Sequence, residues 1–469
     1  MRILVVEDDE NFLAEYLLAL KAVAGLHVTT AKSRDAAITC LETEFFDVIG
    51  LDLKLPTTDH AMDLDITHGE AVFGTAQSLT PGTPVLFLTG SQADPIYESI
   101  LETKEKIDLW GDGTKVDTIQ LKRKSQVAEF VDIVAIYTKR IAELNSIEIS
   151  RNGLDVDLSD EDKRVIRVMA RSFGGTGVSL ASTDGGLSAS RVLRMTVMGD
   201  QGGEKLRAIV KLGGVAEVDD EEGRVRQLHV LRQGDYAPFI STVKAGTRRS
   251  AGILYRLADD FDSNAFALLA QSDDRAAAAV AAVKQIVAPW LATASVQPTS
   301  VAAIRAAYLH DGIAHALAAQ YELSIQEIEQ KVVRSRRSCA HGDLHGVNVL
   351  IGQDDRPILI DFGDVGINPS AIDPITLELS LFSHPAGQAV GKGWKPDFTV
   401  PWRDLAAYSG TSPFPNYIQA TRRWAHEAGF GDDDVYANAY GYCLKQLKYP
   451  DTDKEFFRRA AEAMLSYLA

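Results

Sequence analysis

The sequence is poor in cysteine, has no long apolar run and carries no excess of basic charge. Its three cysteines are scattered among 469 residues without a C-x-x-C spacing, which argues against a disulfide framework or a structural zinc site. Its apolar runs have the length of a strand, far short of the roughly 20 residues that a membrane-spanning helix needs. The sequence has 48 Lys and Arg residues and 65 Asp and Glu residues, so its formal net charge is −17. We therefore expect neither membrane nor nucleic-acid binding.

The amino terminus and the composition narrow the class of protein further. Residues 1–6 form a strand-like segment and lack the longer apolar core and the cleavage site of a signal peptide, so we expect a cytoplasmic protein. Hydrophobic residues make up 46% and charged residues 24%, an ordinary balance for a globular chain. Since domains usually have about 100–200 residues, this length predicts two or three folding units.

Strand-like and amphipathic helical segments alternate through residue 140. Such alternation is typical of a doubly wound parallel sheet that is covered by helices on both faces. The expected strands are residues 3–6, 27–30, 48–51, 85–88 and 119–121, and the expected helices are residues 12–23, 34–42 and 127–144.

A different organisation follows this first domain. A helical pattern near residue 160 leads into a Gly-rich segment and two strand-like segments, which is typical of a small β-rich lobe, and the sequence beyond residue 262 is mostly helical. The predicted parts are a doubly wound domain at residues 1–140, a helical linker at 141–154, a small lobe at 155–262 and a large helical lobe at 263–469.

Acidic residues follow two predicted strands of the first domain. Glu7 and Asp8 come directly after the first strand, and Asp52 comes directly after the third. Ligands of a parallel sheet bind outside the carboxyl ends of its strands, so we expect these side chains to converge there. Converging carboxylates need a cation, and Mg²⁺ prefers a few carboxylates together with water and phosphate oxygens.

A hydroxyl and a lysine complete the predicted site. Thr89 ends the fourth strand, and Lys122 or Lys124 ends the fifth, where they would hold the oxygens of a phosphoryl group on an aspartate. With these residues, residues 1–140 resemble the receiver domain of two-component response regulators. The resemblance implies a flavodoxin-like fold and Asp52 as the phosphoacceptor.

The receiver resemblance also implies a metal, a switch and a partner. Glu7, Asp8 and Asp52 would bind Mg²⁺, Thr89 and the lysine would form the switch, and a histidine kinase or a phosphotransfer protein would donate the phosphoryl group. Two departures stand out. Residues 55–69 form a longer stretch than the usual receiver loop, and Ile119 stands where receivers have a Tyr or Phe.

The run from His341 to Asn348 carries the strongest signal in the chain. Asp343 and Asn348 have the spacing D-x-x-x-x-N, and Asp361 follows 18 residues after Asp343. This spacing lets one loop place an aspartate at an acceptor hydroxyl and an asparagine on Mg²⁺, while a second aspartate binds the metal that bridges the ATP phosphates. The sequence therefore predicts phosphoryl transfer from ATP.

An upstream lobe would supply a phosphate-covering loop and a lysine. The segment that contains Gly186 and Ser188 lies between strand-like segments and can present backbone N–H groups to phosphate oxygens. Lys211 ends an apolar strand, where a lysine is costly unless its ammonium finds an anion. It is the candidate lysine for the ATP phosphates, with Glu221 or Glu222 of the next helical segment as its partner.

Residues 155–469 resemble the aminoglycoside phosphotransferase and choline kinase branch of the protein-kinase-like superfamily. The two motifs carry the resemblance, together with Gly342, where protein kinases have arginine. Similar modules also occur as ternary-complex-associated domains in bacterial conflict systems. The resemblance implies a bilobal, kinase-like α+β fold, with Asp343 as the catalytic base, Asn348 and Asp361 as Mg²⁺ ligands, and Lys211 as an ATP-binding residue.

These motifs together predict a bacterial-type two-component signalling protein. In it, a phosphorylatable receiver controls an ATP- and Mg²⁺-dependent phosphotransferase that acts on a hydroxyl of a small molecule or of a partner protein. The alternative is a non-catalytic, nucleotide-binding pseudokinase scaffold under receiver control. The presence of Asp343, Asn348, Asp361 and Lys211 in one chain favours the enzyme. A DNA-binding regulator is disfavoured because no basic recognition helix follows the receiver.

Overall fold

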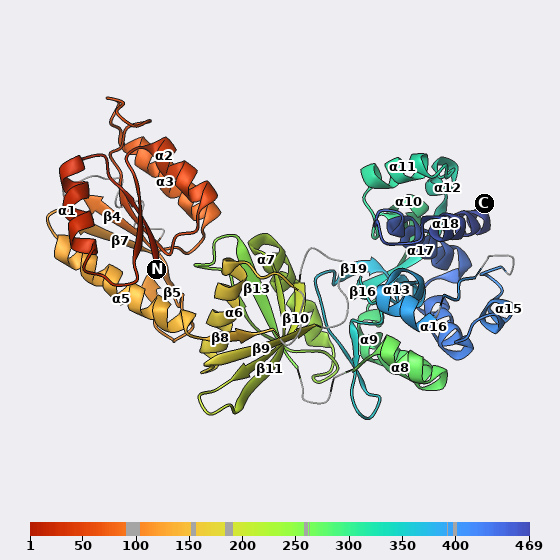
Figure 1. The fold of residues 1–469 in the computed structure, drawn as a ribbon. Helices are drawn as coiled ribbons and strands as arrows, with labels where there is room; N and C mark the ends of the chain where they lie inside the picture. Colours follow the sequence, from red (N-terminus) through yellow and green to blue (C-terminus); the bar gives the residue numbers. More distant parts are fainter. Residues whose placement is uncertain are drawn as a thin grey trace. The chain divides into compact units, whose positions relative to one another are not determined.

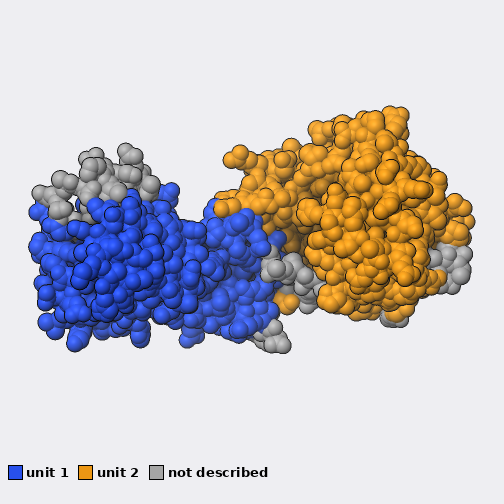
Figure 2. Space-filling view, turned by 90° about the horizontal axis from the view of Figure 1, so that it is seen from above, with its two compact units in different colours: residues 1–181, 190–218, 240–254 blue, residues 182–189, 219–239, 255–469 orange. Residues whose placement is uncertain are grey.

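The computed structural model describes residues 1–90, 104–151, 156–182, 191–257, 261, 263–391, 393–396 and 401–469 (Figure 1). The chain forms two compact units, which Figure 2 distinguishes by colour. Within the described ranges, no helix combines the length and the hydropathy that crossing a bilayer requires. Unit 1 comprises residues 1–181, 190–218 and 240–254, and unit 2 comprises residues 182–189, 219–239 and 255–469.

Unit 1 begins with a five-stranded parallel sheet in the order β2-β1-β3-β4-β7. With the short β5 and β6 set aside, this is the strand order 2-1-3-4-5 of flavodoxin-like doubly wound folds, so the predicted fold class of the first domain is confirmed. The strands are β1 (Arg2–Val6), β2 (His27–Ala31), β3 (Val48–Asp52), β4 (Val85–Thr89) and β7 (Ile119–Arg123).

Helices cover both faces of this sheet (Figure 1). One core cluster joins the sheet to α1 and α5, and a second cluster joins its other face to α2 and α3. Three of the helices begin at an acidic or hydroxyl cap, namely Asp9, Ser33 and Asp65, whose side chains accept from backbone N–H groups of the first turn. The helices are α1 (Glu10–Leu20), α2 (Arg34–Thr43), α3 (Ile66–Leu79) and α5 (Val127–Asn145).

A six-stranded sheet follows, in the order β12-β13-β11-β10-β9-β8. Helix α6 (Asp160–Ser172) packs against it and begins with a capping box between Ser159 and Asp162. Of the predicted helical linker at 141–154, residues 141–145 continue α5 and residues 148–150 form a strand that pairs with β9, while residues 152–154 lie outside the described residues. The strands are β8 (Glu148–Ser150), β9 (Gly177–Ser182), β10 (Arg191–Met198), β11 (Glu204–Gly214), β12 (Phe239–Val243) and β13 (Ser250–Arg256).

The first domain and the six-stranded sheet share one hydrophobic core. The cluster that fills the α1 and α5 face of the parallel sheet continues through Trp110 into α6 and the strands β9 to β11. Trp110 lies between the short strands β5 (Lys106–Ile107) and β6 (Val116–Asp117), which pair as a hairpin. The boundary predicted near residue 155 therefore falls inside a compact unit.

Unit 2 is mostly helical around two small sheets, in the orders β14-β17-β18 and β15-β16-β19. Every residue of α13 is buried, so this helix is the centre of the unit. The elements are α7 (Val215–Arg224), η1 (Val225–Val230), β14 (Ser263–Asn264), α8 (Ala265–Gln271), α9 (Asp273–Leu291), β15 (Ser295–Ser300), α10 (Val301–Arg305), α11 (Asp311–Gln320), α12 (Gln326–Gln330), β16 (Val332–Ala340), β17 (Val349–Ile351), β18 (Pro357–Leu359), β19 (Gly366–Pro369), α13 (Ile372–Ser383), α14 (Pro385–Gly391), α15 (Leu405–Gly410), α16 (Pro415–Ala428), α17 (Gly431–Gln446) and α18 (Lys454–Leu468).

A buried ion pair fixes the helices around α13. Glu378 of α13 accepts from Arg422 Nε of α16 at 2.8 Å and from the indole N–H of Trp402 at 3.1 Å. Arg422 also donates to the backbone oxygen of Trp402 at 2.7 Å. Because all three side chains are almost fully buried, the pair holds these helices in one arrangement, and α13 in turn holds the loop described below.

Candidate functional sites

Three carboxylates meet at the carboxyl edge of the parallel sheet. Glu7 follows β1, Asp8 is the next residue, and Asp52 ends β3, the neighbour of β1 in the sheet. One oxygen atom from each side chain lies within 4.8 Å of the others. Glu7 and Asp52 are buried, whereas Asp8 is partly exposed. The cluster is therefore open to solvent on the Asp8 side.

Lys124 bridges two of these carboxylates. Its Nζ donates to Glu7 Oε1 and to Asp52 Oδ2, each at 2.7 Å. Burial raises the pKa of Glu7 to about 7; the hydrogen bond from Lys124 opposes this rise and the charge of Asp52 adds to it. Burial also raises the pKa of Asp52, although Lys124 opposes that rise. One ammonium therefore does not fully compensate the two buried carboxylates.

A divalent cation could compensate the negative charge that Lys124 leaves on the carboxylates of Glu7 and Asp52. Among the residues that the structure describes, Glu7 Oε2 is buried and has no hydrogen-bond partner. Carboxylate oxygens are the protein ligands that Mg²⁺ prefers, and it keeps several waters besides them. Glu7, Asp8 and Asp52 could thus hold Mg²⁺, with the partly exposed side of the cluster left for water or a phosphoryl group.

The structure separates the two candidate lysines of this site. Lys122 lies within β7, and its Nζ forms an ion pair with Glu129 at 3.3 Å. Lys124 lies one residue past the end of β7 and contacts Asp52. Of the two lysines expected at this edge, Lys124 and not Lys122 therefore occupies the position beside the carboxylates. The aromatic residue expected three residues before the lysine is missing for both candidates, because Ile119 precedes Lys122 and Leu121 precedes Lys124 at that spacing.

Two further predicted receiver residues lie near this edge. Thr89 is the last residue of β4, and its side chain lies outside the described residues. Ile119, at the position where an aromatic was expected, is buried in the core on the α2 and α3 face. A buried isoleucine cannot alternate between a buried and a solvent-exposed side-chain position, as an aromatic residue at the surface could.

In unit 2, the carboxylate of Asp373 holds the loop that follows β16. Its Oδ2 accepts from the backbone N–H of His341, and its Oδ1 accepts from that of Gly342, both at 2.9 Å. Asp373 lies in the first turn of α13 and is 3% exposed. Burial raises its pKa, and the two N–H donors oppose the rise by stabilising the charged form. The loop is thereby tied to the most buried helix of the unit.

His341 joins this loop to the segment that carries Asp361. Its Nε2 lies 2.9 Å from the carbonyl oxygen of Ile360, and the N–H of Ile360 donates to the carbonyl of Asn348 at 3.1 Å. Asp361 follows directly, with a φ of 63°. A left-handed conformation at a residue other than glycine costs on the order of 1–3 kcal/mol and persists only where neighbouring contacts impose it.

The backbone of Asp343 is anchored while its carboxylate stays accessible. The N–H of His345 and the Nδ2 of Asn348 both donate to its carbonyl oxygen at 2.9 Å, and its side chain is 36% exposed. Because Asn348 uses its amide nitrogen for this bond, its Oδ1 is left for a cation. Asn348 Oδ1 and the Asp361 carboxylate are oxygen donors of the kind that Mg²⁺ accepts.

A lysine that the motifs did not reveal lies beside Asp343. Lys445, near the end of α17, places its Nζ 3.6 Å from Asp343 Oδ1. Burial alone would lower the pKa of Lys445, but the charges of Asp343, Tyr449 and Asp364 and the hydrogen bond to Asp343 together outweigh it, so the pKa is raised and the ammonium stays charged. His345 contacts the other carboxylate oxygen, with its Nε2 3.8 Å from Asp343 Oδ2. Burial lowers the pKa of His345, which is therefore neutral at pH 7.

The structure describes only part of the predicted nucleotide site. Lys211 lies in β11, near the middle of the six-stranded sheet, and is partly buried. Gly186 and Ser188 lie outside the described residues. The phosphate-covering role of that segment stays a prediction.

The two candidate partners of this lysine differ in their surroundings. Both lie in α7; Glu221 is buried and accepts from the hydroxyl of Tyr255 at 2.7 Å, whereas Glu222 is partly exposed. Lys211 belongs to unit 1, and both glutamates belong to unit 2. The ion pair with Glu221 or Glu222 therefore also stays a prediction.

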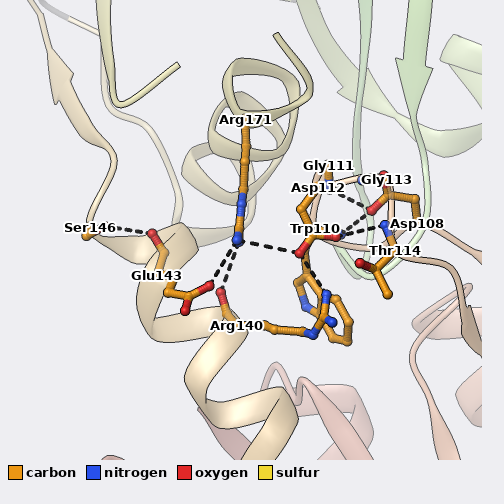
Figure 3. Close-up of polar contacts among 10 residues, drawn as sticks. All are labelled: Asp108, Trp110, Gly111, Asp112, Gly113, Thr114, Arg140, Glu143, Ser146 and Arg171. Atoms are coloured by element: carbon orange, nitrogen blue, oxygen red, sulfur yellow. Dashed lines mark hydrogen bonds and ion pairs between the residues drawn. The ribbon is translucent and has the colours of Figure 1, made fainter. Parts of the chain in front are cut away.

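Polar contacts tie the first domain to α6 within unit 1 (Figure 3). Arg171 of α6 donates to Glu143 Oε2 at 3.0 Å and to the carbonyl of Arg140 at 3.2 Å, both on α5. Arg140 in turn contacts Asp112 of the β5–β6 loop at 2.7 Å. Elsewhere on this contact, the largely buried Arg164 of α6 pairs with Asp47 at 2.8 Å.

Comparisons with known proteins bear on both halves of the chain. Residues 255–407 match a family model described as the phosphotransferase enzyme family. The search of curated proteins found no match. A thermostable mutant of aminoglycoside phosphotransferase APH(4)-Ia, solved with AMP-PNP and hygromycin B, is 14% identical, with a TM-score of 0.41, and the match covers 65% of this chain and 97% of that one.

Receiver domains match the amino-terminal part. The receiver domain of the Francisella response regulator 1452 is 20% identical with a TM-score of 0.23, covering 30% of this chain and 98% of that one. The receiver domain of a sensor histidine kinase from Pseudomonas aeruginosa PAO1, solved with a magnesium ion in its active-site cleft, is 20% identical with a TM-score of 0.22, covering 29% and 97%. Residues 255–407 thus match the phosphotransferase enzyme family, within the part of the chain where the sequence resembled such enzymes, and the receiver domains match the part that forms the parallel sheet.

Proposed function

We propose that this chain is a two-component signalling protein in which a phosphorylatable receiver controls an ATP- and Mg²⁺-dependent phosphotransferase. The phosphotransferase acts on a hydroxyl group of a small molecule or of a partner protein. The observation that carries the proposal is the loop around Asp343, whose backbone is fixed from both sides while its carboxylate remains accessible.

The residues of the predicted site have distinct roles in this proposal. Asp343 orients the acceptor hydroxyl and takes its proton, which requires an anchored backbone and a carboxylate that the acceptor can reach. Asn348 and Asp361 hold Mg²⁺ through side-chain oxygens. The ion neutralises charge on the ATP phosphates when bound. Lys211 contributes a further positive charge to those phosphates.

The receiver site supports the regulatory half of the proposal. Asp52 is the phosphoacceptor, with Mg²⁺ held by the neighbouring carboxylates and Lys124 placed to bind an oxygen of the phosphoryl group. The donor is a histidine kinase or a phosphotransfer protein. The signal reaches the kinase-like part through the packed contact between α5 and α6.

Cell extract and γ-labelled ATP provide the test. The purified chain, supplied with Mg²⁺, should transfer label to an extract component. Asp343→Ala should lower this transfer by orders of magnitude and leave ATP binding intact, because the residue acts on the acceptor and not on the nucleotide. Glu327→Ala, an exposed residue of α12, is the matched control.

Three outcomes separate the alternatives. Label transfer that depends on Asp343 supports the enzyme. Saturable Mg·ATP binding without any transfer identifies a pseudokinase scaffold instead. Transfer at an unchanged rate in Asp343→Ala removes that residue from the mechanism.

A further inference from the structure

A cavity of about 550 Å³ opens beside the loop that carries Asp343. Gly342 of that loop and Asp364 form part of its wall, and the rest comes from segments around residues 306–313, 366–372 and 445–448. All of the lining lies in unit 2. Small-molecule sites have volumes of about 300–1,000 Å³, so the cavity has the size for a metabolite. Its lining includes Gly342, which precedes the proposed catalytic base Asp343, and Lys445, whose Nζ lies 3.6 Å from Asp343 Oδ1.

The charge of the lining is opposite to the charge of the chain. Three cationic side chains, Arg224, Lys445 and Lys448, line the cavity, against the single carboxylate of Asp364. The chain as a whole carries −17. A cluster of positive charge in a strongly acidic protein attracts anions locally, since a concave, partly desolvated wall focuses the field of its charges.

The three cations differ in how far their charge is already compensated. Lys445 lies 3.6 Å from Asp343. Arg224 pairs with Asp220 at 2.6 Å, and both of these side chains are partly exposed. Lys448 is exposed, and within the described part of unit 2 it has no carboxylate at ion-pair distance; its Nζ lies only over the ring of Tyr449.

We propose that this cavity is the acceptor site and that it takes an anionic hydroxyl compound, a small alcohol or sugar that also carries a phosphate or a carboxylate. The inference rests on the proposed function. Lys448 and Arg224 bind the anionic group, and Lys445, 3.6 Å from Asp343 Oδ1, positions that carboxylate next to the hydroxyl. A polycationic acceptor would meet three like charges in this cavity.

The transfer step balances without any further reactant. The acceptor hydroxyl oxygen forms a bond to the γ-phosphorus of ATP, and the bond from that phosphorus to the β–γ bridging oxygen breaks. ADP leaves with the bond's electron pair, and the hydroxyl proton passes to Asp343. The product is a phosphate ester that carries one more anionic group than the acceptor.

Fractionated cell extract tests the charge of the acceptor. Small molecules are separated by ion exchange into anionic, neutral and cationic fractions, and each fraction is incubated with the full chain, Mg²⁺ and γ-labelled ATP. We expect labelled product from the anionic fraction alone. Lys448→Gln should raise the acceptor concentration needed for half-maximal rate by about 10- to 100-fold, as loss of a charge-assisted hydrogen bond does.

Two companion variants show whether the charge is responsible. Lys448→Arg retains the positive charge and should restore most of the affinity. Lys21→Gln removes an exposed lysine of unit 1 and should change nothing.

The possible results distinguish a failure of the anionic-acceptor inference from a failure of the proposed phosphotransferase function. Label in the neutral or cationic fraction, or on protein only, overturns the anionic acceptor while the phosphotransferase stands. An unchanged acceptor requirement in Lys448→Gln likewise removes that lysine from the site and overturns the inference. No label in any fraction or protein refutes both.

Discussion

Replacing Gly111 by alanine should loosen the contact between the receiver-like domain and α6. Gly111 lies in the β5–β6 loop with a φ of 68°. A Cβ atom there would lie 2.3 Å from the carbonyl oxygen of Val168 and 3.1 Å from the N–H nitrogen of Ser172, both in the backbone of α6. Backbone atoms of a helix cannot move aside alone, so the loop must shift away from α6.

Gly113 provides a matched control in the same loop. Its φ is 81°, yet a Cβ atom there would meet nothing within 4 Å. Both substitutions carry the cost of a left-handed alanine, about 1–2 kcal/mol, and only Gly111→Ala adds the clash. Overpacking of this kind costs typically about 1–3 kcal/mol. That difference corresponds to a factor of about 5 to 150 in the local opening equilibrium.

Hydrogen–deuterium exchange of α6 in the full chain measures this equilibrium directly. Relative to Gly113→Ala, the amides of α6 should exchange about 5- to 150-fold faster in Gly111→Ala. Gly111→Ala removes none of the ion pairs around α6, so a change in the exchange rate of α6 would reflect the steric clash of the added Cβ atom. Equal protection of α6 in the two variants would show that the loop does not restrain the helix, and this contact could then not couple the first domain to α6.

Three further predictions concern the two sites. Gly342→Ala should lower phosphoryl transfer at least 10-fold, because its Cβ atom would lie 2.4 Å from the carbonyl oxygen of Asp364 and shift the loop; wild-type turnover would contradict this. Asp361→Asn should reduce the stabilisation by Mg·ATP in thermal unfolding, which for the wild type is about 2.7 kcal/mol at 100 times the Kd; an equal shift would exclude Asp361 as a ligand. Lys124→Met should tighten Mg²⁺ binding, because the Lys124 ammonium competes with the cation for the Asp52 carboxylate. The same variant should lose the stabilisation by beryllofluoride; if that stabilisation were retained, Lys124 would not contact the phosphoryl group.

The elements with a strong local pattern could be predicted from the sequence, and the elements without one could not. The five strands of the parallel sheet and α5 lie where the apolar periodicity placed them, because each buries a face that the pattern shows directly. Helix α3 and the β5–β6 hairpin were missed. The hairpin strands are two residues each, too short for any period, and their position depends on packing against α6.

The choice of receiver lysine shows a second limit. Lys122 and Lys124 are two residues apart, so strand alternation directs them to the same face and cannot separate them. What separates them is the end of β7 at Arg123, which leaves Lys124 free to turn toward Asp52. Strand ends are set by pairing with the neighbour, here β4, and not by the residues alone.

The kinase-like site shows a third limit, which is distance along the chain. Asp343, Asn348 and Asp361 could be recognised because one loop and one hairpin hold them at fixed spacing. Lys445 lies about a hundred residues later, and its place beside Asp343 depends on how α17 packs in the helical lobe. No local pattern marks such a residue, so the cationic cavity could not be foreseen.

A single helix connects the surroundings of Asp52 with α6, within unit 1. Lys124, which contacts Asp52, lies three residues before α5, and α5 contacts Arg171 of α6 near its other end. Nineteen helical residues span about 28 Å, and a helix held in a continuous core moves as a rigid rod. If Asp52 is phosphorylated as proposed and the phosphoryl group redirects Lys124, we expect the free energy of the α5–α6 contact to change without any docking step. Coupling of this kind is reciprocal for binding, so nucleotide on the kinase-like part must change beryllofluoride affinity at Asp52 by the same factor that beryllofluoride changes nucleotide affinity.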